Sequence, residues 1–220
     1  MSSMGDPFTP YKMNSSQTRL VTLVLLGWLC FAVGLTGWFH NASAPAVAAT
    51  IWTLTALALV ACWKIDGVRA LALDVDIRWL VGLHLTRLIA GIYFLALCHR
   101  GELPCAFALP AGWGDIFVAV IALAVIAAMR TQPAKTLLLG WNTIGLIDIG
   151  FVVFSALRFG LRDWQSMHAL RELPLSLLPT FLVPLIIASH VLIFVRLARG
   201  CELKTRDGEA RTSTNRKSQI

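Results

Sequence analysis

The stretch VGLHLTRLIAGIYFLALCHR, Val81 to Arg100, is apolar enough to cross a lipid bilayer, yet it carries His84 and Arg87 well inside the run. A hydrophobic run of about 18 residues or more is the usual signature of a membrane-spanning helix. An ionisable side chain near the bilayer centre costs at least about 2.5 kcal/mol on insertion scales, so it needs a partner or a polar cavity. The stretch therefore predicts both a membrane span and a polar interior beside it.

The whole chain has the composition of a membrane protein. It has 220 residues, of which 57% are hydrophobic and only 14% are charged, whereas soluble domains hold about 25% charged residues. Its long apolar runs predict spans near residues 20–40, 45–63, 77–98, 107–129, 136–158 and 174–196. We expect an all-α, polytopic integral membrane protein with six transmembrane helices in one bundle.

The basic residues indicate how the chain is oriented. Its formal charge of +7 does not point to nucleic acid, because Lys and Arg gather in the loops on one side of the predicted spans and in the C-terminal tail. This distribution predicts a cytoplasmic N-terminal segment (1–19), a transmembrane domain (20–199) and a basic cytoplasmic tail (200–220). We expect the bacterial inner membrane, with the tail attracted to anionic inner-leaflet lipids. The few basic residues predicted outside are Arg100, Arg158, Arg162 and Arg171.

Ionisable and amide side chains inside the last four predicted spans form the candidate polar site. The rise of about 1.5 Å per helical residue places three of them at a similar depth, roughly 9 to 10 Å from the cytoplasmic face. Arg87 lies between that layer and two aspartates, so we predict that it pairs with one or both of them, because an unpaired buried charge is costly. The candidates are His84, Arg87, Asp115, Asn142, Asp148 and His190.

These residue types are compatible with three classes of function. Two histidines that titrate near neutral pH, two carboxylates and an arginine could form a relay for proton-linked or small-solute transport. Alternatively, His84 and His190 could be the axial ligands of a b-type haem in a membrane redox protein. A third interpretation is a non-catalytic scaffold or subunit, in which the polar network fixes the register of the helices.

Other motifs are few. The sequence contains no HExxH or HxxxH motif, so it defines no metal ligand set, and we favour a non-enzymatic role. Cys98 and Cys105 flank a short segment on the predicted outer side and could close a disulfide in an oxidising compartment. The expected partner is the lipid bilayer, while a second copy of the chain or another membrane subunit stays open, as do substrate and reaction.

Overall fold

The computed structural model describes residues 15–129 and 135–199, and these residues form helices joined by short turns. Six helices in this part of the chain are long and apolar enough to cross a membrane, which matches the predicted number. We call them spans 1 to 6. The largest differences from the predicted bounds are four residues, where span 5 ends at Arg162 and span 6 begins at Leu178. The spans are Thr18–Trp38, Ala44–Lys64, Ile77–Arg100, Cys105–Ala128, Lys135–Arg162 and Leu178–Arg199.

The basic tail and most of the predicted N-terminal segment lie outside the described residues. In the described part, the α-helices are α1 (Ser15–Gly34), α2 (Thr36–Phe39), α3 (Ala44–Lys64), α4 (Asp66–Asp74), α5 (Ile77–Leu83), α6 (Thr86–Arg100), α7 (Cys105–Ala128) and α8 (Lys135–Arg162). A 3₁₀ turn (His168–Arg171) and a π-helical turn (Leu178–Leu182) follow. Residues 183–199 then form the last α-helix.

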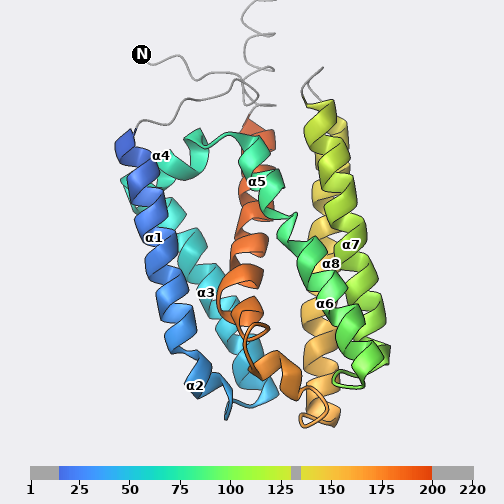
Figure 1. The fold of residues 1–220 in the computed structure, drawn as a ribbon. Helices are drawn as coiled ribbons and strands as arrows, with labels where there is room; N and C mark the ends of the chain where they lie inside the picture. The colour runs from blue at the N-terminus through green and yellow to red at the C-terminus, as the bar shows by residue number, and fades with distance from the viewer. Residues whose placement is uncertain (1–14, 130–134, 200–220) are drawn as a thin grey trace, which may run out of the picture.

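The spans fall into two groups joined by the last helix (Figure 1). Helices α6, α7 and α8 pack together on one side, and α1 and α3 lie on the other. The π-helical turn before the last helix contacts both α1 and α3. The start of α1 and the end of the last helix lie at the same end of the bundle, where α4 crosses it (Figure 1).

Span 3 is divided, although the sequence predicted one continuous helix. Helix α5 ends at Leu83 and α6 begins at Thr86. The turn between them uses tighter i to i−3 hydrogen bonds, such as that from the Arg87 amide to the His84 carbonyl at 3.1 Å. The Thr86 hydroxyl donates to the Leu83 carbonyl at 2.7 Å, which satisfies an acceptor that the break would leave open. The break places His84 at the junction of two half-helices.

Helices α6 and α7 approach closely at two glycines. A Cβ atom added to Gly91 would lie 2.5 Å from the Gly112 carbonyl oxygen, and one added to Gly112 would lie 2.9 Å from the Gly91 carbonyl oxygen. Small residues at such crossings allow backbones in membrane helices to touch. Arg87 lies one turn before Gly91, and Asp115 lies three residues after Gly112. The crossing therefore brings these two side chains within reach of each other.

Polar residues separate two apolar cores. Each of spans 3 to 6 passes from one hydrophobic cluster to the other, and the candidate polar residues lie between the two. One cluster includes Phe94, Ala111, Ile149 and Ile187. The other includes Val81, Val118, Trp141 and Ile193. The fold thus places the candidate polar residues in one region of the interior.

We expect Gly91→Ala to lower the free energy of unfolding by about 1 to 3 kcal/mol, because the new methyl group overlaps the α7 backbone and overpacking has costs of this size. The measurement is reversible unfolding in mixed detergent micelles. Gly150→Ala is the matched control, since a Cβ at Gly150 has no atom within 4 Å. That control should be neutral or slightly stabilising, because Ala is the better helix former. Equal effects of the two substitutions would contradict the close approach.

Candidate functional site

Arg87 lies between two carboxylates from different helices. Its Nε donates to Asp115 Oδ1 of α7 at 2.6 Å. Its Nη2 donates to Asp148 Oδ2 of α8, and its Nη1 donates to the Gly145 carbonyl at 3.2 Å. The sequence predicted that Arg87 would pair with one aspartate or both, and the structure contains both pairs. We call Arg87, Asp115 and Asp148 the ion group.

The members of the ion group differ in their access to the surroundings. The side chains of Arg87 and Asp115 are 1% and 5% exposed, whereas that of Asp148 is 18% exposed. Asp148 is thus the carboxylate that can exchange a proton with the surroundings with the least rearrangement of the structure. With both carboxylates ionised the group carries a formal charge of −1, and one bound proton would make it neutral.

His84 is held at one ring nitrogen. Its Nε2 lies 3.0 Å from Ser189 Oγ, and the Ser189 hydroxyl donates its hydrogen to the Ile186 carbonyl at 2.7 Å. Because that hydrogen is used, Ser189 Oγ accepts from a His84 Nε2–H group. In the neutral ring, His84 Nδ1 then carries a lone pair, and this buried atom has no hydrogen-bond partner among the described residues.

His190 is held in the complementary way. The Asn142 amide nitrogen donates to the His190 carbonyl at 3.0 Å, so Asn142 Oδ1 faces His190 Nδ1 at 2.8 Å and accepts from it. This assignment leaves the lone pair on His190 Nε2, which is likewise buried and unpartnered within the described chain. Both imidazoles therefore keep a free proton-accepting nitrogen inside the bundle.

The imidazole layer touches the ion group at Gly145. The rings of His84 and His190 lie 4.2 Å apart between centroids, and Trp141 packs its edge against His84 at 4.9 Å. The Gly145 carbonyl accepts from Arg87, and a Cβ at Gly145 would lie 2.6 Å from His190 Cε1. His84, Asn142 and His190 thus lie together, as predicted, and Gly145 contacts both this layer and the ion group.

The site has a poor fit to haem. Bis-histidine ligation needs two rings separated by the porphyrin plane and its iron. His84 and His190 instead contact each other directly, and both are fully buried. No group of three or more His, Cys, Asp or Glu side chains suited to a metal ion occurs in residues 15–129 and 135–199. We therefore derive no chemistry through haem or metal.

A small cavity lies next to the ion group. Its volume is about 20 Å³, enough for roughly one water molecule. Arg87 and Asp115 supply its charged side, and the remaining wall is mostly apolar, with Phe94 from α6 and Leu178, Leu182 and Ile186 from span 6. The polar interior thus includes one space of the size of water.

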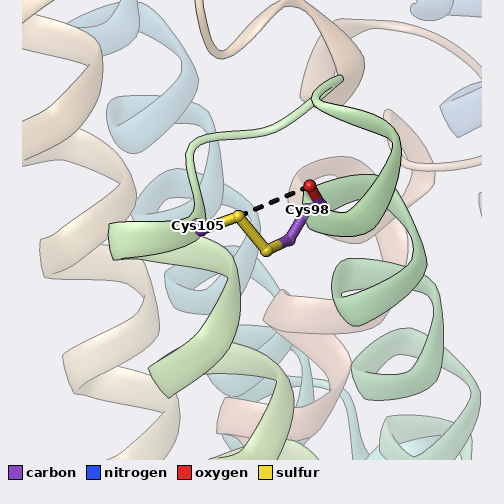
Figure 2. The surroundings of a disulfide bond; sticks show 2 residues. All are labelled: Cys98 and Cys105. Carbon is purple, nitrogen blue, oxygen red and sulfur yellow. Dashed lines mark hydrogen bonds between the residues drawn. A yellow bond between two sulfur atoms is a disulfide. The ribbon is translucent and has the colours of Figure 1, made fainter.

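The end of α6 and the start of α7 are linked covalently. Figure 2 shows the disulfide between Cys98, near the end of α6, and Cys105, the first residue of α7. Gly101 ends α6 in the left-handed region with φ of 73°, a conformation that glycine adopts without strain. The sequence proposed this pair from the short separation of the two cysteines, and the structure contains the bond.

Several contributors to the site are not among the candidate residues that the sequence predicted. Ser189 and Gly145 complete the hydrogen-bond network, and Trp141 closes it on one side with its indole donating to the Val118 carbonyl at 3.0 Å. Ser189 lies next to His190 in the chain, and Gly145 lies three residues from both Asn142 and Asp148. Proximity to a candidate residue was therefore the available signal, although neither residue type is unusual in a span.

A family model described as a domain of unknown function (DUF8737) matches residues 41–198, which include spans 2 to 5, span 6 up to residue 198 and the entire ion group. No curated protein and no solved structure matches the chain.

We expect Arg87→Met to lower the free energy of unfolding by about 3 to 5 kcal/mol, because it leaves the buried Asp115 and the partly buried Asp148 without their cation. Asp148→Asn should have a much smaller effect, since the remaining Arg87–Asp115 pair is formally neutral. Reversible unfolding in mixed micelles measures both. Arg158→Met, at an exposed position of α8, is the control and should change little. A loss for Asp148→Asn as large as that for Arg87→Met would contradict the charge balance described here.

Proposed function

We propose that this chain, which belongs to the DUF8737 family, is an integral membrane protein that moves protons by way of its ion group. The observation that carries the proposal is the charge imbalance of that group, in which one buried and one partly buried carboxylate share a single guanidinium.

The distribution of side chains supports residence in a bilayer. Large apolar side chains such as Ile89, Ile147 and Phe154 are exposed along the spans, while His84, Arg87 and His190 are fully buried. A protein surrounded by water would leave far less continuous apolar surface exposed. Lipid is the surrounding that suits this surface, because it makes an outward apolar face favourable and an outward charge costly.

Charge and the disulfide support a bacterial inner membrane with cytoplasmic termini. Lys64, Arg69 and Arg78 lie at the end of the bundle where α1 starts, and basic residues favour the cytoplasmic side. The Cys98–Cys105 bond lies at the opposite end. Disulfides persist in oxidising compartments such as the periplasm. Two independent signals therefore favour the same orientation.

The charge of the ion group favours a proton as its ligand. A net negative charge in a medium of low dielectric constant is unfavourable, and binding one proton makes the group neutral. Asp148 is the carboxylate that can take up that proton most easily, because its side chain is more exposed than that of Asp115. Arg87 contacts both carboxylates and can favour either one as the ionised partner.

The surroundings of the ion group favour a proton over a larger solute. The adjacent cavity holds about one water molecule, and protons can pass along hydrogen-bonded groups without an open channel. His84 and His190 each offer an unpartnered nitrogen on the cytoplasmic side of the group. The divided span 3 and the π-helical turn of span 6 resemble the discontinuous helices that commonly form ion sites in transporters.

The test is proton flux in liposomes that contain the purified protein and an internal pH-sensitive dye, with an imposed membrane potential. We expect wild-type protein to carry protons well above the rate of empty liposomes. Asp148→Asn should reduce this flux at least about tenfold, a loss equivalent to about 1.4 kcal/mol or more, because it removes the exchanging carboxylate. Asp148→Glu should keep part of the flux, and Asp66→Asn, at an exposed carboxylate of α4, should keep all of it.

Infrared spectroscopy separates proton binding from proton transport. A pH titration of wild-type protein should show a protonated carboxyl band that Asp148→Asn changes and Asp66→Asn does not. Wild-type flux equal to that of empty liposomes would refute transport, and a missing carboxyl band would refute proton binding. Failure of both would favour the alternative of a non-catalytic scaffold, in which the network serves only to fix helix register.

Orientation has its own test. In a Cys30→Ala, Cys62→Ala, Cys201→Ala background, an impermeant reductant followed by an impermeant maleimide should label Cys98 and Cys105 in intact cells. In the same background with Cys98→Ala and Cys105→Ala, a cysteine introduced by Lys64→Cys should react only after the cells are opened, because Lys64 lies at the other end of the bundle. The reverse pattern would invert the proposed topology.

A further inference from the structure

We propose that Trp28 of span 1 is a positioning residue for the proton site, which it affects through the π-helical turn Leu178–Leu182. This inference deepens the proposed function, and its claim about proton passage rests on that function. Trp28 itself lies outside the ion group, because the π-helical turn separates the two.

The Thr180 backbone carbonyl lacks the donor that it would have in a regular α-helix. Pro184 has no N–H group, so it cannot donate to the Thr180 carbonyl four residues earlier. The Trp28 indole nitrogen donates to that carbonyl at 3.0 Å. Thr180 is fully buried, and its own hydroxyl donates to the Ser176 carbonyl at 2.8 Å. In an apolar bundle a backbone acceptor without a partner is costly, so the Trp28 bond stabilises this turn.

The π-helical turn contacts both Trp28 and the cavity beside the ion group. Trp28 also packs edge-on against Phe181, with ring centroids 5.5 Å apart. Leu178 and Leu182 of the same turn form part of the wall of the cavity beside Arg87 and Asp115. The π-helical turn is therefore the single layer of chain between Trp28 and this cavity.

Span 1 is packed loosely against the rest of the bundle. Among the side chains of span 1 whose burial is described, only that of Ala32 is buried. Span 1 precedes the matched residues 41–198, whereas Thr180 and Pro184 lie inside them. The donor for the Thr180 carbonyl thus comes from a loosely packed helix outside the family match. Displacement of span 1 would release the turn without disturbing the helices that carry the ion group.

Loss of the Trp28 hydrogen bond is expected to increase hydration of the site. Without the indole N–H, the Thr180 carbonyl loses the donor that it has in the structure, and water that inserts in its place loosens the turn. A less ordered wall admits more water beside Asp115 and so increases the passage of protons. Span 1 in its observed position therefore restrains hydration of the site.

The test is a double-mutant cycle of Trp28→Phe and Pro184→Ala. Trp28→Phe keeps an aromatic ring against Phe181 but removes the donor. Pro184→Ala supplies a backbone N–H that can replace it. We expect Trp28→Phe to raise hydrogen exchange of the amides in residues 176–186 by about tenfold, equivalent to about 1.4 kcal/mol, and to raise proton flux severalfold. In the Pro184→Ala background the same substitution should change either quantity by less than about twofold, well under 1 kcal/mol.

Two controls isolate the hydrogen bond. Trp52→Phe alters an exposed tryptophan of α3 and should leave exchange in residues 176–186 unchanged. Phe181→Leu removes the ring contact but keeps the donor, so its effect should be smaller than that of Trp28→Phe. Equal effects of Trp28→Phe in both backgrounds, or unchanged exchange in this turn, would overturn the proposal.

The two readouts separate this inference from the proposed function. Exchange measures the contact between Trp28 and Thr180 whether or not protons move. If wild-type protein carries no flux, the proposed function fails together with the claim on proton passage, and exchange still decides whether Trp28 holds the turn. If wild-type flux is present and Trp28→Phe changes neither readout, only the role of Trp28 fails.

Discussion

The structure depends on the need to pair the positive charge of Arg87 inside an apolar bundle. The Arg87 guanidinium is a donor with no acceptor atoms of its own, so an apolar bundle can contain it only by surrounding it with acceptors. Helices α7 and α8 each supply one carboxylate, and the Gly145 carbonyl supplies a third acceptor. These three contacts fix the relative positions of α6, α7 and α8. The surplus of negative charge that results is also the chemical property on which the proposed function is based.

The sequence was sufficient for the helices and for much of the polar site. Long apolar runs predicted the six spans, because the length and hydropathy needed to cross a bilayer leave a strong signal. The rise per residue was enough to place His84, Asn142 and His190 in one layer, and the cost of a lone buried charge was enough to pair Arg87 with acids. These inferences succeed because each depends on a local pattern or on a single large energy.

Other features could not be read from the chain in the same way. The break at His84 has no proline, and its tighter hydrogen bonds depend on how α5 and α6 pack with their neighbours. The partner of the Thr180 carbonyl lies 152 residues away in the chain, so no local pattern predicts it. The contact between the two imidazoles likewise depends on the crossing of spans 3 and 6. That contact, rather than the shared depth of His84 and His190, is what removes the space a haem would need.

The pairing of α6 with α7 has a mechanical consequence. The two helices are joined by a disulfide at one end, touch backbone to backbone at Gly91 and Gly112, and are bridged by the bond from Arg87 to Asp115. Three attachments spaced along the pair prevent either helix from sliding or rotating against the other. The α6–α7 pair is therefore rigid. A change in the exposure of Asp115 would require movement of α8 or span 6 relative to this pair.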